Sequence, residues 1–172
     1  MEESYCLSDE ASQIVFARVY NLGWAGFPGI LSTLQNNESF SLFVKLATLL
    51  SLGEKLENEQ GLTLFIPDDQ VLKKYNDILS KTIGSNIELI STIIKNHIFK
   101  GVIIPDFLTA LDGTALKAVN GAGYDVNIKI IHDIPMVVLH WKSGESEREA
   151  IIRHEGIKCK NGIIYVIDHL LI

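Results

Sequence analysis

Two adjacent aspartates, Asp68 and Asp69, follow an apolar run and Pro67, and their carboxylates are the first groups in the chain that could do acid–base chemistry. A catalytic carboxylate pair needs side chains that converge on one reacting atom. Neighbouring residues at a helix start diverge instead, and Asp68 stands where a helix N-cap belongs. Asp69 in the first turn gains from the helix dipole. The pair is therefore predicted to begin a helix and not to catalyse a reaction.

Histidines are the second source of chemistry. His97 falls on the apolar face of a predicted helix, so we expect a core histidine that is hydrogen-bonded to backbone. His140 and His154 fall on neighbouring predicted strands, and with Glu155 they could approach one another as metal ligands. No two histidines have the i, i+4 spacing of a helical zinc site, and HExxH does not occur in the sequence. The sequence predicts no metal site and no cofactor.

Cys159 is the only candidate nucleophile with a suggestive setting, because Lys158 and Lys160 flank it and would lower the pKa of an exposed thiol. Nucleophilic catalysis also needs a base and an oxyanion hole, and the sequence marks neither. GxGxxG, GxxxxGK[ST] and GxSxG do not occur in the sequence. A thiol- or metal-dependent hydrolase built on Cys159, His140 and His154 is kept as a distant alternative.

Length and charge limit the function further. The chain has 172 residues and a net charge of −6, which favours one globular domain and argues against nucleic acid as a partner. Cys6 and Cys159 are interpreted as two reduced thiols, although one optional bridge stays open. The start is acidic and unlike a signal peptide, and residues 14–34 contain Arg18 and Pro28, so no transmembrane segment is expected. Asn37 begins a glycosylation sequon, which matters only in a secreted chain.

The periodicity of apolar residues predicts helices first and strands afterwards. Helices are expected over 8–22, 30–36, 39–52, 68–75 and 86–100, and the run 62–66 reads as a strand. Asp112 and Gly113 predict a hairpin. The alternation over 124–132 predicts a strand with Val126, Ile128 and Ile130 on one side and Asn127 and Lys129 on the other. Two more hairpins are expected around the polar loop 142–148 and the turn 160–162. This order is typical of an α+β fold with helices on one face or end of antiparallel sheets.

Three segments together resemble the fasciclin domain family. Leu62–Leu72, "LTLFIPDDQVL", looks like its first motif, a strand that enters a helix. Asn96–Gly101, "NHIFKG", looks like its central tyrosine-histidine segment, and "NGIIYVIDHLLI", Asn161–Ile172, is similar to its closing motif. The resemblance implies a wedge of two antiparallel β-sheets with a mainly N-terminal helical layer. It covers a domain over residues 29–172 and leaves a helical extension over residues 1–28.

The resemblance also implies function. Fasciclin domains are non-enzymatic modules without a common cofactor that act in cell adhesion and matrix interaction, mostly outside the cell. It assigns a candidate interaction segment for a protein or cell-surface partner, which contains Asn96, His97, Ile98 and Phe99. Integrin-type binding is not implied, because Gly156-Ile157 stands where the family has Asp-Ile, Asn96 stands at the tyrosine and Tyr165 at the closing histidine.

The remaining motif residues are interpreted as structural: Pro67, Asp68, Asn161, Gly162 and Asp168. Asn161-Gly162 suits a turn with positive φ. Asp168 interrupts an apolar run, so its carboxylate is expected to sit inside the protein and accept hydrogen bonds from backbone amides, as a polar fastener comparable to His97. The runner-up function is a small-ligand or lipid-binding module with a pocket between the helical layer and the sheets.

Overall fold

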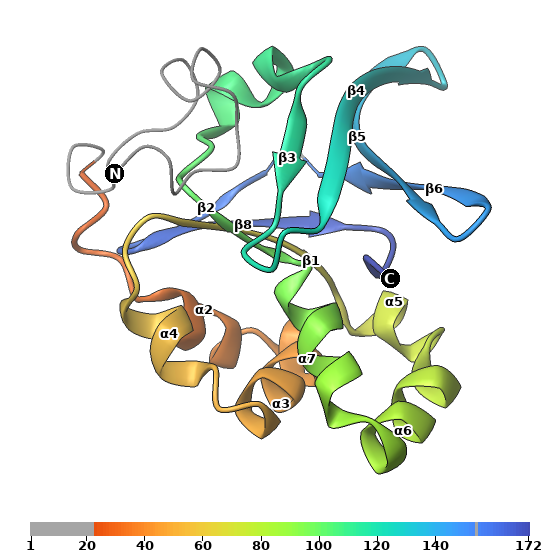
Figure 1. Ribbon diagram of the computed structural model, residues 1–172. Helices are drawn as coiled ribbons and strands as arrows, with labels where there is room; N and C mark the ends of the chain where they lie inside the picture. Colours follow the sequence, from red (N-terminus) through yellow and green to blue (C-terminus); the bar gives the residue numbers. More distant parts are fainter. Residues whose placement is uncertain (1–22, 154) are drawn as a thin grey trace.

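The computed structural model describes residues 23–153 and 155–172, so the helix predicted over 8–22 lies outside it (Figure 1). The helices are α2 (Ile30–Gln35), η3 (Glu38–Phe40), α3 (Ser41–Leu49), α4 (Gly53–Asn58), α5 (Asp69–Lys73), α6 (Asn76–Ser85), α7 (Ile87–Lys95) and η4 (Pro105–Leu111). The strands are β1 (Leu62–Pro67), β2 (Ile98–Lys100), β3 (Ala115–Lys117), β4 (Gly123–Ile131), β5 (Ile134–Ser143), β6 (Ser146–Ile152), β7 (Ile157–Cys159) and β8 (Gly162–Ile167). The α+β class is confirmed.

The strands form one sheet in the order β2-β1-β8-β6-β5-β4-β3, with β7 paired to β8. The predicted wedge of two antiparallel sheets is not confirmed, because the strands belong to one sheet and β1 and β8 are parallel over their whole length. The halves of the sheet meet at a single described pair, Ile152↔Ile167. Near the opposite edge the Val119 amide donates to the Ile98 carbonyl, so the sheet is nearly closed.

β1 and β8 lie between two apolar cores. All six residues of each strand are buried, as expected for a parallel pair that is covered on both faces. The helices cover one face, where Leu64, Ile66 and Ile164 meet apolar side chains of α2, α3 and α7. The strands β3 to β6 fold over the other face, around Phe65 and Tyr165 (Figure 1). The parallel pair of β1 and β8 therefore holds the first motif, residues 62–72, beside the closing motif, residues 161–172.

Two local predictions, the hairpin at Asp112-Gly113 and the end of the helix over 86–100, were wrong. Asp112 and Gly113 form the turn between η4 and β3, not a hairpin. The strand expected over 124–132 is β4, in which Val126 is buried, whereas Ile128 and Ile130 are exposed because β4 runs beyond the core towards the tip of its hairpin with β5. The helix expected over 86–100 ends at Lys95, so that the chain can enter β2.

The other hairpins are confirmed. β5 and β6 pair from Val137↔Ile152 to Ser143↔Ser146, and β7 and β8 pair around Lys160 and Asn161. The boundary proposed after residue 28 stays a prediction. Trp24, on the extension side of it, is buried in the core beside β3 to β6, and Pro28 accepts a hydrogen bond from the Lys160 amide at 2.9 Å.

Candidate functional site

The candidate interaction segment runs from the end of α7 into β2. Asn96 is the C-cap of α7, and the next three residues enter the sheet. His97, Ile98 and Phe99 expose at most 1% of their surface, whereas Asn96 is half-buried. Asn96 is thus the only one of the four side chains that reaches the surface, and partner binding by this segment stays a prediction.

His97 is a neutral core histidine. Its Nε2 accepts from the Leu171 amide at 3.0 Å, so the proton sits on Nδ1, which donates to the Ile93 carbonyl at 2.8 Å. Complete burial lowers the pKa of His97 to about 4, against the smaller opposing effect of hydrogen bonds with Ile93 and Ile94. The imidazole stays uncharged near neutral pH and ties α7 to the C-terminal segment, as the sequence predicted for a core histidine.

Two further side chains hold the same C-terminal segment, residues 168–172. Asn96 Nδ2 donates to the Leu171 carbonyl at 2.7 Å, and Asn120 Nδ2 donates to Asn96 Oδ1 at 2.8 Å. Trp141 Nε1 donates to the Ile172 carbonyl at 3.0 Å. Leu171 therefore has both backbone groups bonded to Asn96 and His97, the two residues that follow α7, and it is fully buried.

The acid pair is structural. As predicted, Asp68 is the N-cap of α5, and its Oδ1 accepts from the Val71 amide at 3.1 Å. Asp69 binds a different helix: its Oδ1 accepts from the Leu42 amide at 2.9 Å and its Oδ2 from the Ser41 hydroxyl at 2.6 Å. The two carboxylates thus serve the starts of two helices and do not converge.

Asn161 is a fully buried hydrogen-bonding centre. Its Oδ1 accepts from the Ile30 amide at 3.0 Å, and its Nδ2 donates to the Leu56 and Glu59 carbonyls, both at 2.9 Å. Its own carbonyl accepts from the amides of Gly61 and Leu62. One side chain and one carbonyl therefore join α2, α4 and β1 to the start of β8.

The reason predicted for Gly162 was wrong. Asn161 and Gly162 do not belong to the residues with positive φ. A Cβ on Gly162 would overlap the Leu62 carbonyl oxygen and press on Ile30 Cδ1. Glycine is required because β8 approaches β1 closely, and not because of a left-handed turn.

Asp168 lies at the surface, and the expectation of a buried carboxylate was wrong. Its side chain is 44% exposed. The expected backbone donor is present, since Oδ1 accepts from the Ile151 amide at 2.7 Å, and His169 Nδ1 lies 3.0 Å from the same oxygen. Asp168 therefore fastens the end of β8 to β6 from the outside.

The candidate nucleophile is buried. Cys159 lies in the core under the helices, with Sγ 3.5 Å from the Thr33 hydroxyl, and burial raises the pKa of its thiol. The flanking lysines therefore do not activate it, and Cys159 forms no disulfide with a described residue. His140 lies on β5, which does not pair with β7, the strand of Cys159. It pairs with Glu149 of β6, and its Nε2 lies 3.8 Å from Glu147 Oε1. His154 and Cys6 lie outside the described residues.

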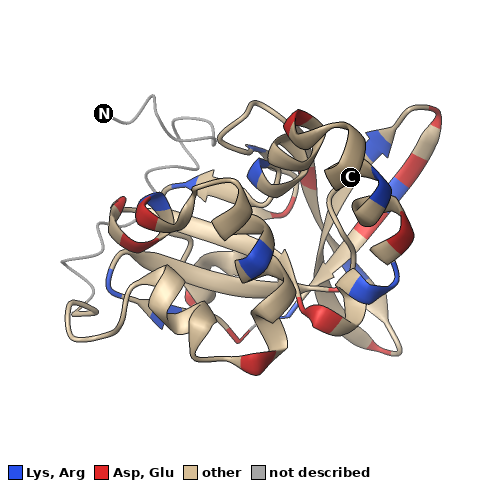
Figure 2. Cartoon of the chain, turned by 90° about the horizontal axis from the view of Figure 1, so that it is seen from below, with Lys and Arg blue, Asp and Glu red and all other residues tan. Residues whose placement is uncertain are grey.

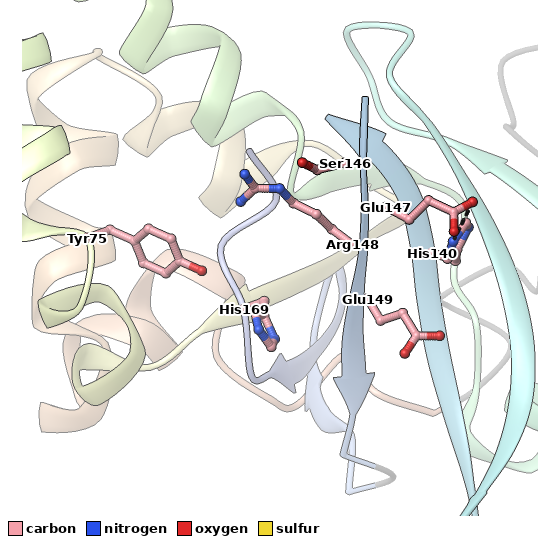
Figure 3. Close-up of a pocket in the computed structure, with 7 residues that line it drawn as sticks. All are labelled: Tyr75, His140, Ser146, Glu147, Arg148, Glu149 and His169. Atoms are coloured by element: carbon pink, nitrogen blue, oxygen red, sulfur yellow. Dashed lines mark ion pairs between the residues drawn. The ribbon is translucent and has the colours of Figure 1, made fainter. Parts of the chain in front are cut away.

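An open groove beside β6 is a surface feature that the sequence did not predict. We call it the β6 groove; it has a volume of about 760 Å³ and is lined by Tyr75, His140, Ser146, Glu147, Arg148, Glu149 and His169. Figure 3 shows Arg148 pointing from β6 towards Tyr75 and His169, whereas Glu147 and Glu149 lie on the other side of the strand with His140. Residues 142–148 were predicted to be a polar loop. The alternation of arginine and glutamates was the available signal for a strand edge.

The outer face of α2, η3 and α3 carries a groove of about 430 Å³, whose lining includes Leu34, Glu38 and Val44. The space between the helices and the sheet is filled by apolar side chains. A groove of about 170 Å³ opens between α3, α5 and α6, where Leu42, Leu72 and Ile83 lie. This volume is below the 300–1,000 Å³ that is common for small-molecule sites. None of the helices in the described ranges is long and apolar enough to cross a membrane.

Comparison with known proteins identifies the family. The family model of the Fasciclin domain matches residues 38–172. The chain belongs to the fasciclin family. No curated protein sequence matches it. The fold is similar to the solved structure of a FAS1 domain pair from the insect cell adhesion molecule fasciclin I, with a TM-score of 0.65 and 18% identity over 84% of this chain. The chain spans about half, 51%, of that solved chain.

Two of the positions that depart from the family pattern, Tyr165 and Gly156, pack against the core, whereas Asn96 is half-buried. Tyr165 replaces the closing histidine; its ring stacks on Phe65 with 5.5 Å between centroids, and its hydroxyl donates to the Ile103 carbonyl. Gly156 replaces the expected aspartate, and a Cβ there would press on Ile163 and Tyr165. The fasciclin fold is thus kept with different core contacts, and the family's acidic contact is missing here.

Proposed function

We propose that this fasciclin domain is a non-enzymatic module that mediates contacts with a partner protein at the cell surface or in the extracellular matrix. The family is associated with cell adhesion. The observation that carries the proposal is the use of the motif side chains: Asp68, His97, Asn161 and Asp168 are all hydrogen-bonded to backbone groups of the domain itself. These groups stabilise the fold, which leaves the surface to do the binding.

The surface suits a protein partner better than nucleic acid. Figure 2 shows Lys and Arg interspersed with Asp and Glu over the helices and the hairpin strands. With the net charge of −6, this pattern favours specific charge pairing with another protein over attraction to a polyanion.

Binding to cells and matrix tests the proposal. The 172-residue chain would be biotinylated, assembled into tetramers on streptavidin so that weak contacts add up, and applied to cells and matrix of the source organism. We expect saturable binding that trypsin treatment of the cells removes. The control is the same tetramer with Asn161→Ala, which removes the internal hydrogen-bonding centre and is expected to unfold at a lower temperature.

Two results would contradict the proposal. Binding that survives trypsin but is competed by liposomes would favour the lipid-binding alternative. Absence of saturable binding to both cells and matrix, with a folded tetramer, would refute the interaction role.

A further inference from the structure

The β6 groove exists because β6 and β8 separate. They pair at Ile152↔Ile167, and the amide of Arg153 donates to the Val166 carbonyl. Continued as an antiparallel pair, β8 would place Asp168 opposite Ile151 and Leu171 opposite Arg148. The chain does not continue in this way, because Leu171 is bonded to Asn96 and His97 instead. Among residues 23–153 and 155–172, no strand lies along the outer edge of β6 beyond Ile151.

The backbone of this edge is aimed into the groove. The amides of Ile151 and Arg153 point away from β5, towards Asp168 and Val166. Hydrogen-bonding direction alternates along an antiparallel strand, so the amides and carbonyls of Glu147 and Glu149 point the same way. Residues 146–149 are all exposed.

Asp168 already imitates the missing strand at one position. Its Oδ1 accepts from the Ile151 amide at 2.7 Å, where the carbonyl of a neighbouring strand would otherwise accept. The next outward amides along the edge, those of Glu149 and Glu147, offer the same geometry to an acceptor from another chain. Tyr75 and His169 form the opposite wall and leave a groove of about 760 Å³ between them and the strand.

We propose that the open edge of β6 binds an extended segment of a partner protein as an added β-strand, with basic, acidic and basic side chains opposite Glu147, Arg148 and Glu149. This inference rests on the proposed function and assigns its contact site. Strand addition derives its affinity from main-chain hydrogen bonds and its specificity from alternating side chains. Residues directly opposite one another share a face of the sheet, which fixes the charge pattern of the partner.

The charges also select a foreign segment over a second copy of this chain. Two β6 edges paired antiparallel about Arg148 would place arginine against arginine and Glu147 against Glu149. Pairing about Glu147 or Glu149 would oppose that glutamate to its own copy. Like charges directly opposite are destabilising, and charged edges are a known protection against self-pairing.

A designed peptide tests the site on the full chain. The probe is the acetylated and amidated heptapeptide Thr-Val-Lys-Glu-Lys-Val-Thr, titrated into isotope-labelled protein while backbone amide shifts are recorded. We expect saturable binding at or below about 1 mM, with the largest shifts at Glu147 and Glu149. The charge-swapped peptide Thr-Val-Glu-Lys-Glu-Val-Thr should bind at least about tenfold more weakly.

Two substitutions of Glu149 separate the contribution of its backbone amide to peptide binding from that of its carboxylate. Glu149→Pro removes the outward amide without touching the pairing with β5, a place where edge strands tolerate proline, and should weaken the probe about tenfold. Glu149→Gln keeps the amide and loses the carboxylate, including its 2.8 Å contact with Lys129, and should change binding by less than about threefold. If Glu149→Pro does not fold, probe peptides methylated on alternate backbone nitrogens make the same comparison on the native chain.

Several outcomes would overturn the site. The site is refuted if the probe does not bind or if the shifts are centred on the helices. It is also refuted if the swapped peptide binds as tightly as the probe, or if Glu149→Pro binds the probe as tightly as the native chain does. Concentration-dependent shifts at Glu147 and Glu149 without peptide would assign the edge to a second copy instead. The titration uses no cells, so it tests the site separately from the proposed function. If the chain binds the peptide but binds neither cells nor matrix, the proposed function is refuted and the site stands.

Discussion

Acidification from pH 7 to pH 4 should destabilise the domain through His97. The unfolded chain has a histidine with an ordinary pKa of 6.5, whereas the folded pKa is about 4. Between these values the unfolded state binds more protons, so the stabilisation is complete above pH 6.5 and is lost as the pH falls to 4. At 1.36 kcal/mol per unit, the difference is worth about 3 kcal/mol.

The structural cause is the bond to Leu171. Protonated Nε2 cannot accept from the Leu171 amide, which lies 3.0 Å away, and the charge would be fully buried. Equilibrium urea unfolding at several pH values, followed by tryptophan fluorescence, measures the effect. The comparison is with His97→Gln, which should be less stable at pH 7 and should lose about 3 kcal/mol less on acidification.

The exposed His132 provides the matched control. His132→Asn keeps a residue that tolerates the positive φ of 51° at this position, and its pH dependence should follow that of the native chain. Equal slopes for the native chain and His97→Gln between pH 7 and pH 4 would show that His97 is not the titrating group and would refute the reasoning.

Three further variants test the internal contacts. Asn161→Ala breaks three side-chain hydrogen bonds, two of them buried, and should lower the free energy of unfolding in urea by about 3 kcal/mol. The exposed Asn127→Ala should cost less than about 0.5 kcal/mol, and a loss below about 1 kcal/mol for Asn161→Ala would contradict its role. Gly162→Ala should lower Tm by several degrees through overlap with β1, and equal melting with Gly123→Ala, where a Cβ meets open space, would contradict this. In a Cys6→Ser background, Cys159 should react with a thiol reagent only on unfolding; fast native labelling would contradict its burial.

Local chemistry in the sequence predicted much of the fold correctly. Asp68 could be predicted as the cap of α5 because its carboxylate accepts from the Val71 amide, only three residues later. Such a contact depends on no distant part of the chain. The turn between β7 and β8 could be predicted in the same way, from Lys160, Asn161 and Gly162 between two apolar runs. His97 could be placed in the core because it shares a helical face with isoleucines.

Pairings between distant segments could not be predicted in the same way. Asp69 was interpreted through its own helix, yet it binds the start of α3, 27 residues away. Asn161 was interpreted as a turn residue, yet its side chain bonds Ile30, 131 residues away. The parallel pairing of β1 with β8 had one overlooked signal: both strands read as continuous apolar runs, which is typical of strands covered on both faces.

The C-terminal segment links the stability of the domain to the proposed binding edge. Asn96 and His97 hold both backbone groups of Leu171, and Trp141 holds the carbonyl of Ile172. Leu170 and Leu171 also expose at most 1% of their surface. The bonds and this burial keep the segment off the outer edge of β6, so the edge that the proposed partner strand needs stays open because the C-terminal segment is held in the core.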